Sequence, residues 1–396
     1  MEQLNYNVAS NSAPIGFIGA STGVVNSGNL EVLLIAHANQ QLVKFNIFTT
    51  VTGYAEIWQA VVSDFADKFA LGGLEFVIHD SGATPGVVAL RLRQSYEDYL
   101  SHTKLTNPHY VELTPRGRIN ALVDSGSFHE IYSANQQLTS PHLGQLDLLT
   151  SFDDGVVIGD AQINGKSIGI IAQQANFMGG AVGEVHGAKI VGMCLRALHK
   201  QFSGVVLLLD SGGVRLQEAN AGEIAISEII KSIFALRLAG IPVVALVAGK
   251  NGAFGGIGIT AACSDTLLIS EQGRSGVSGP EVIETVMGVD EYDSKDRALV
   301  WRTCGGKHRA LLGLSEYCSS DFTQLKQHLV LALKRKVELD TNSLVQQNNH
   351  LASLLNNFSN CHDATEIWSA LGVTNPVQVP DLSDADFQQL LLSLAR

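Results

Sequence analysis

Two glycine clusters, each placed directly after an apolar run, constrain this chain more than any other feature. Residues 205–209 lead into Asp-Ser-Gly-Gly-Val-Arg, and residues 241–248 lead into a segment that ends in Phe-Gly-Gly. A strand followed by a glycine turn and a helix exposes amides that lack an intrahelical partner and lie at the positive end of the helix dipole. Glycine has no Cβ, so another group can approach the backbone closely. Two such turns that converge would form an oxyanion hole. The candidate donors are the amides of Gly212, Gly213, Val214, Gly255 and Gly256.

Each cluster also has a simpler interpretation. A single strand–Gly-Gly–helix segment is more often a tight connection than a binding site. The occurrence of two such units about forty residues apart favours a shared site. Neither cluster matches the spacing G-x-G-x-x-G or G-x-x-x-x-G-K-[ST], which argues against phosphate binding by a nucleotide-type loop.

Composition narrows the class of protein. With 396 residues the chain is long enough for two or three domains. Its net charge of −12 argues against nucleic-acid partners and anionic membranes, which select basic surfaces. The five cysteines form no C-x-x-C pair, so we expect reduced thiols and no metal site. No signal pattern and no apolar run of about 18 residues is found, which predicts a cytoplasmic protein without a membrane partner.

Hydrophobic periodicity predicts an α/β protein with two units. Residues 1–100 form the first unit, with strands at 16–20, 30–36, 42–51 and 74–78 and helices at 55–70 and 87–100. Residues 101–114 lack periodicity and are expected to form a linker. Residues 115–396 form the second unit. Strands and helices alternate there to about residue 313, and helices follow at 322–357 and 383–396.

The central block resembles carboxyltransferases of the crotonase-like superfamily, through segments 177–190, 211–219 and 254–256. Together with segments 279–284 and 290–293, it looks most like the β subunit of biotin-independent malonate decarboxylase. The resemblance covers roughly residues 110–330. It implies a crotonase-like (carboxyltransferase) ββα-superhelix domain.

The N-terminal unit resembles a different subunit of the same enzyme. Segments 24–34 and 80–88 are similar to the δ subunit, an acyl-carrier domain. The resemblance implies that Ser27 bears a 2'-(5''-phosphoribosyl)-3'-dephospho-CoA arm through a phosphodiester, with no biotin and no metal. Members of this family encode the two units as separate chains, so their fusion here is a departure.

The resemblance also implies roles for residues beside the glycine turns. Phe177, Gly179 and Gly180 are expected to line the site of the malonyl or acetyl thioester, and a turn that only packs against the core is the alternative. His186 is a candidate proton donor, although a lone histidine is more often structural. Arg215 could bind a carboxylate in a bidentate manner, and a salt bridge with Glu218 is an equally strong alternative.

Three functions remain open at this stage. The first is decarboxylation of a malonyl-carrier thioester, which implies a γ-type carboxyltransferase-like subunit, an α-type acyl-carrier transferase subunit and a prosthetic-group transferase as partners. The second is a biotin-dependent acyl-CoA carboxyltransferase. The absence of a Met-Lys pair and of a Cys₄ zinc ribbon argues against it. The third is a non-catalytic scaffold that tethers the carrier.

Overall fold

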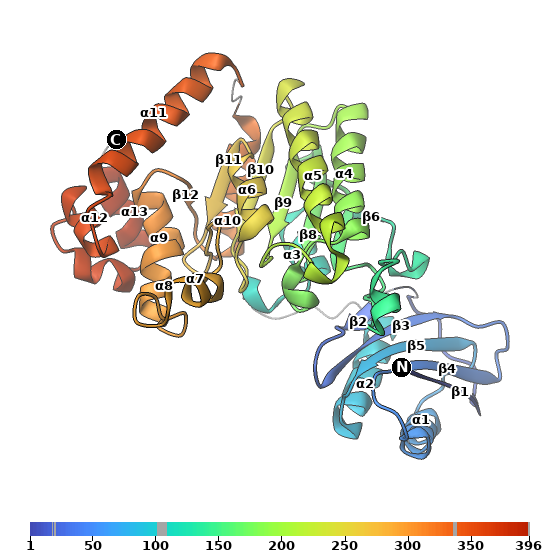
Figure 1. The fold of residues 1–396 in the computed structure, drawn as a ribbon. Helices are drawn as coiled ribbons and strands as arrows, with labels where there is room; N and C mark the ends of the chain where they lie inside the picture. Colours follow the sequence, from blue (N-terminus) through green and yellow to red (C-terminus); the bar gives the residue numbers. More distant parts are fainter. Residues whose placement is uncertain (18, 20, 101–108, 336–338, 395–396) are drawn as a thin grey trace.

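The computed structural model describes residues 1–396 except 18, 20, 101–108, 336–338 and 395–396, and Figure 1 shows two α/β units. The N-terminal domain contains a five-stranded sheet in the order β1-β4-β5-β3-β2. Only the pair β4–β5 is parallel. Its elements are β1 (Glu2–Ala9), β2 (Ser21–Gly23), β3 (Asn29–Ala36), β4 (Leu42–Thr49), α1 (Ala55–Lys68), β5 (Leu74–Ser81) and α2 (Pro85–Leu100).

Both helices of this domain pack on one face of the sheet. Trp58 and Phe65 of α1 and Leu92 of α2 share a core with the strands. The predicted helices and the strands near 30–36, 42–51 and 74–78 are confirmed. The predicted strand at 16–20 is wrong for its described residues. The amides of Phe17 and Gly19 instead donate to the carbonyls of Tyr99 and Leu34. Strand β1, whose side chains alternate between half-buried and exposed, was not predicted.

The second domain contains a seven-stranded sheet in the order β12-β11-β10-β9-β8-β7-β6. Strands β8 to β12 are parallel, and β6 and β7 complete the sheet in antiparallel pairs. Its strands are β6 (His129–Ile131), β7 (Val156–Ile163), β8 (Lys166–Gln173), β9 (Val205–Leu209), β10 (Val243–Val247), β11 (Thr266–Ile269) and β12 (Glu316–Tyr317).

Helices cover both faces of this sheet, because the parallel strands are apolar on both sides. Helices α4, α5 and α6 pack on one face. Helices α3 and α10 pack on the other, together with Tyr110. The helices up to this point are α3 (Pro115–Leu122), α4 (Glu184–His199), α5 (Asn220–Leu238), α6 (Gly255–Ala262), α7 (Pro280–Met287), α8 (Arg297–Cys304), α9 (Gly306–Leu311) and α10 (Phe322–Lys334).

A helical region completes the chain, as the sequence predicts, and forms a separate small core around Trp368 and Phe387. The predicted helix 322–357 is divided into α10 and α11. Helix α11 has no buried residue, and Figure 1 shows it extending along the outside of the domain. The remaining helices are α11 (Thr341–Phe358), α12 (Ala364–Ala370) and α13 (Asp384–Ser393).

The predicted linker spans residues 101–114, of which residues 101–108 lie outside the described residues. Its last residues are packed against the second domain. Tyr110 is 1% exposed and starts a short 3₁₀ turn, and its carbonyl accepts a hydrogen bond from Arg118 Nε at 3.1 Å. Tyr110 therefore belongs to the second domain.

Strand β3 shows how the two domains meet, because it is buried on both faces. A strand with only one face on a core alternates between buried and more accessible residues. Strand β4 shows such an alternation, between buried and half-buried side chains. Leu30, Val32 and Leu34 face the core of the N-terminal domain. Leu33, on the opposite face, packs with Phe152 of the second domain. The second domain thus covers the face of the N-terminal sheet that lacks helices.

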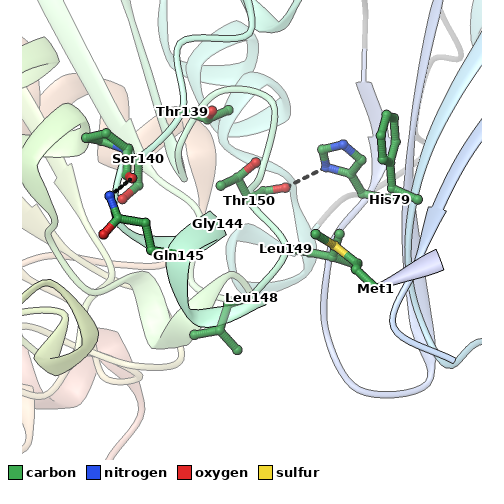
Figure 2. A pocket seen from close by; sticks show the side chains of 11 residues that line it. Met1, His79, Thr139, Ser140, Gly144, Gln145, Leu148, Leu149 and Thr150 are labelled. Atoms are coloured by element: carbon green, nitrogen blue, oxygen red, sulfur yellow. Dashed lines mark hydrogen bonds between the residues drawn. The ribbon is translucent and has the colours of Figure 1, made fainter. Parts of the chain in front are cut away.

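Polar contacts accompany this packing. The Glu31 carboxylate accepts hydrogen bonds from Ser151 Oγ and the Phe152 amide, both at 3.2 Å. The His79 ring stacks on Phe152 with the ring centres 4.2 Å apart. Its Nδ1 donates to the Thr150 carbonyl at 2.7 Å, as Figure 2 shows. Beside these contacts a cavity of about 390 Å³ lies between Met1, Phe48 and His79 on one side and residues of segment 139–150 on the other.

Glu31 gives the junction a testable dependence on pH. Burial, reinforced by the charge of Asp153, raises the pKa of Glu31 to about 8, and this outweighs the two hydrogen bonds it accepts. Because the pKa of Glu31 is higher in the folded protein than in the unfolded chain, its contribution to stability is complete when the pH is below about 4.5. This contribution is lost as the pH rises through about 8. We expect the unfolding free energy of the wild type, relative to Glu31→Gln, to fall between about pH 4.5 and 8. Denaturant titrations of both proteins across this range measure the difference, and parallel pH profiles would contradict the assignment.

Candidate active site

The two glycine turns meet at the carboxyl ends of β9 and β10, where parallel α/β sheets commonly place their sites. Ser211 and Ala253 form a parallel β-bridge, and the Phe254 amide donates to the Ser211 carbonyl at 3.1 Å. An ideal Cβ on Gly255 would lie 3.4 Å from the Cα of Gly213. Positive φ angles of 138° at Gly213 and 56° at Gly255 explain the glycines at this close approach.

Internal hydrogen bonds occupy three of the five candidate donor amides. The Gly212 amide donates to the Gly179 carbonyl at 3.0 Å, and the Gly255 amide to the Val277 carbonyl at 2.9 Å. The Gly213 amide donates to Ser211 Oγ at 3.1 Å.

The other two candidate donors differ from these three. In the part of the chain that the structure describes, no hydrogen bond engages the amides of Val214 and Gly256. Both residues are partly exposed. The geometry therefore leaves one free donor on each turn.

The Gly179-Gly180 turn supports the first glycine loop. Gly180 has a φ of 73°, and a Cβ there would lie 2.1 Å from the Asp210 carbonyl oxygen. Gly179 is exposed and has open space beside it, so it lies at the accessible edge of the site. Phe177 is 1% exposed and lies under the Arg215 guanidinium at 5.1 Å. Phe177 therefore packs beneath this surface, which favours the packing alternative for this residue over a place in the lining.

Arg215 is 1% exposed, and its guanidinium is held between two carboxylates. Its Nη1 lies 2.9 Å from Asp154 Oδ1 and 2.8 Å from Glu218 Oε1. Its remaining nitrogens donate to the carbonyls of Asp154 and Ala181. This placement favours the salt-bridge alternative over carboxylate binding. Arg215 fixes the loop that follows Val214.

The substitution Arg215→Leu separates these two roles. It leaves Asp154 and Glu218 buried without their partner, and we expect a loss of about 3–5 kcal/mol of unfolding free energy. Arg215→Lys, which retains a charge, should lose less. Urea denaturation followed by circular dichroism measures the effect. An unchanged unfolding free energy together with a raised KM would instead assign Arg215 to substrate binding.

His186 is fully buried, and its ring is enclosed by the same network. Nδ1 lies 3.1 Å from the Asp154 carbonyl and Nε2 lies 3.2 Å from Gln173 Nε2. Burial and the nearby charges of Arg215 and Lys189 hold the pKa of His186 well below its ordinary value. His186 is therefore neutral and has no access to the surface of the glycine turns. The structure favours the structural alternative for this residue.

Two acidic residues that the sequence analysis did not single out organise the site. Asp154 pairs with Arg215 and accepts from the His186 amide at 2.8 Å. Asp210 is fully buried at the end of β9 and pairs with Arg118 at 2.8 Å. Its other oxygen accepts from the Asn251 amide at 2.7 Å, which ties the second turn to the first. The only signal for Asp210 in the sequence is an acid between an apolar strand and a glycine pair.

Ser27 lies in the exposed turn between β2 and β3. Asn26 Oδ1 accepts from the Ser27 amide at 2.8 Å, and the Gly28 amide donates to the Ser81 carbonyl at 2.8 Å. Gly28 has a φ of 71°, and no atom lies within 4 Å of an ideal Cβ there. In the described part of the chain no hydrogen bond engages the Ser27 hydroxyl. The turn is held by its backbone while the hydroxyl is accessible to a large covalent group.

The mixed sheet with two converging glycine turns is of the crotonase-like carboxyltransferase class. Residues 110–310 match the family model "Carboxyl transferase domain", and residues 19–99 match "Malonate decarboxylase delta subunit". The chain belongs to the carboxyl transferase family and carries an acyl-carrier domain of the malonate decarboxylase type in the same polypeptide.

Individual relatives agree with both halves. A malonyl-S-ACP:biotin-protein carboxyltransferase, MADC, from Malonomonas rubra is 34% identical over 72% of this chain and 96% of its own length. The malonate decarboxylase acyl carrier protein of Stenotrophomonas maltophilia is 41% identical over 26% of this chain and 96% of its own. A chain of the Pseudomonas malonate decarboxylase hetero-tetramer in complex with malonate is 34% identical, with a TM-score of 0.61. That match covers 65% of this chain and 95% of the Pseudomonas chain.

Two features are absent from the described residues. None of their helices has the length and apolar character needed to cross a membrane. Nor do they contain a group of three or more His, Cys, Asp or Glu side chains arranged to hold a metal ion.

Proposed function

We propose that this chain is the carrier and decarboxylase component of a malonate decarboxylase. Ser27 holds the malonyl thioester through a CoA-derived arm, and the glycine turns of the second domain release CO2 from it. The observation that carries the proposal is the pair of free amides, Val214 and Gly256, on two turns that meet in a chain with its own carrier domain.

The chemistry requires stabilisation of a developing negative charge. When the bond between the carboxylate carbon and the α carbon breaks, its electron pair moves toward the thioester carbonyl and CO2 leaves. The amides of Val214 and Gly256 donate to that oxygen, and each donor lowers the barrier by about 3 kcal/mol. A proton from water or an acid then reaches the α carbon, which yields the acetyl thioester. The burial of His186 makes a water molecule the better candidate donor.

The arm fits the surroundings of Ser27. Ser27 is exposed, and no atom lies within 4 Å of an ideal Cβ on Gly28, so the turn leaves room for a phosphodiester-linked group beside the hydroxyl. The group supplies a thiol that forms the thioester. We assign it as 2'-(5''-phosphoribosyl)-3'-dephospho-CoA because segments 24–34 and 80–88 resemble the δ subunit.

Three partners follow from this function. The second half of the site is expected from a γ-type carboxyltransferase-like subunit, an α-type subunit exchanges acetyl for malonyl on the carrier, and a prosthetic-group transferase modifies Ser27. The related Pseudomonas enzyme is a hetero-tetramer, which agrees with a multi-subunit assembly.

A second candidate function is transfer of the carboxyl group to a biotin protein, as the name of the Malonomonas relative states for that protein. The first half of the reaction is the same, and only the acceptor of the carboxyl group differs. Insensitivity of malonate turnover to avidin, with full CO2 release by purified subunits, would favour direct decarboxylation.

Intact-mass measurement tests the carrier assignment. The chain, purified from its native host, should exceed its sequence mass by one phosphoribosyl-dephospho-CoA group, and peptide mapping should place the addition on Ser27. An unmodified Ser27 in chain that supports malonate turnover would contradict the assignment.

A further inference from the structure

We propose that the carrier domain docks on the carboxyltransferase domain of its own chain and delivers its thioester to that chain's glycine turns. This inference rests on the proposed function of Ser27. It adds which active site the carrier serves and through which surface.

The turn that bears Ser27 lies next to the docking surface. Val24 and Val25 share an apolar cluster with Leu143, Leu149 and Phe177 of the second domain. Two peptide units separate Val25 from Ser27, so their Cα atoms lie at most about 7.6 Å apart. Docking through the two valines therefore fixes the attachment point while leaving its hydroxyl exposed.

The docking surface continues directly into the active site. Met178 packs against the same apolar cluster, and Gly179 follows it in the chain. The Gly179 carbonyl accepts the Gly212 amide at 3.0 Å, which joins this turn to the first glycine loop. Ser27 and the free amide of Val214 thus lie at the two ends of one continuous contact path within a single chain.

The junction has the features of a specific interface. Glu31 is 3% exposed and directs its carboxylate at the second domain, a burial that a freely tumbling carrier domain does not require. Gly19 lies so close to Asn135 that an ideal Cβ on Gly19 would fall 2.0 Å from the side-chain nitrogen of Asn135. Arg116 reaches Ser21 Oγ at 3.5 Å while it pairs with Glu130 at 2.7 Å. Apolar packing, hydrogen bonds and a close backbone approach therefore act together.

The first experiment disrupts docking with substitutions in the second domain. The sequence of the carrier domain, which the modifying enzyme recognises, is therefore unchanged. Leu149→Asp places a charge in the apolar cluster, whereas Leu146→Asp alters an exposed leucine of the same segment. With Ser27 fully loaded in both full-length proteins, conversion of malonyl- to acetyl-carrier should slow at least about tenfold in Leu149→Asp and remain unchanged in Leu146→Asp. Hydrogen exchange of β3 should rise in Leu149→Asp only. Equal conversion rates in the two variants would overturn the proposal.

The second experiment separates delivery within a chain from delivery between chains, and does not depend on the stability of Leu149→Asp. Ser27→Ala chains, which lack the arm, are mixed with loaded Gly213→Val chains, which lack the site, in the presence of the partner subunits. Delivery within a chain predicts that the mixture is as inactive as either variant alone. Recovery of activity well above both would overturn this inference while supporting the proposed function. If loaded wild-type chain itself fails to release CO2, the proposed function fails instead.

Discussion

Ser27→Ala is expected to abolish malonate turnover without changing the fold. The residue is exposed and its hydroxyl makes no hydrogen bond in the described structure, so its removal costs no packing. Without the hydroxyl the arm has no attachment point, and turnover should fall to the background of the assay. Activity of the reconstituted enzyme and the intact mass of the chain measure the two effects.

An exposed serine of the same domain provides the control. Ser12 lies outside the β2–β3 turn, and its hydroxyl donates to the Gln40 carbonyl at 3.0 Å. Ser12→Ala should keep both the added mass and the turnover. Full turnover in Ser27→Ala would show that the thioester is carried elsewhere.

Gly213→Val is expected to slow decarboxylation of the loaded carrier by about 10² to 10³-fold, the effect of losing one oxyanion donor. The φ of 138° is one that side chains rarely adopt, and the new Cβ would lie 3.6 Å from the Phe254 carbonyl oxygen. The two branches of valine then fill the space between the turns and rotate the amide of Val214. Single-turnover conversion of malonyl-carrier measures the loss, while loading of Ser27 should be unaffected.

Gly240→Val controls for backbone strain. Gly240 has a φ of 72° with open space around it, outside the glycine turns. Gly240→Val should lower the free energy of unfolding by about 1–2 kcal/mol and leave the rate of decarboxylation unchanged. Gly256→Val is a weaker test, because its Cβ would lie 2.7 Å from Ile226 and disturb the packing of α5. A Gly213→Val variant that converts preformed malonyl-carrier at the wild-type rate, and is impaired only in the loading step, would contradict the oxyanion assignment.

The glycine turns could be predicted from the sequence because their signal is local. Apolar strands, glycine pairs and the helices that follow them are close in sequence, and the parallel sheet brings the strand ends together. Which amides remain free could not be predicted. The Gly255 amide is taken by Val277 and the Gly212 amide by Gly179, and both partners depend on how distant loops pack.

The roles of Arg215 and His186 illustrate the same limit. Glu218 lies three residues from Arg215, so a salt bridge between them could be considered from spacing alone. Asp154, the second partner, lies 61 residues away and gave no signal. Because Asp154 also holds the His186 amide, both side chains are drawn into one buried network beneath the site.

The junction between the domains had a signal that the sequence analysis did not use. Strand β3 carries Glu31 within an otherwise apolar run, and both faces of that run are buried. Periodicity alone cannot identify the second layer that covers such a strand, because strands buried on both faces also occur inside a single domain. The contact of Glu31 with Ser151 and Phe152 identifies that layer as the second domain of the same chain.

The most direct test of the central claim is a rapid-quench single turnover of the loaded, full-length chain with its partner subunits and without any biotin protein. The mass of the Ser27-linked group is followed with time. We expect the malonyl mass to be replaced by the acetyl mass, with CO2 released in equal amount and with no effect of avidin. A malonyl group that stays on Ser27 until a biotin protein is added would contradict the account and assign carboxyl transfer to this chain.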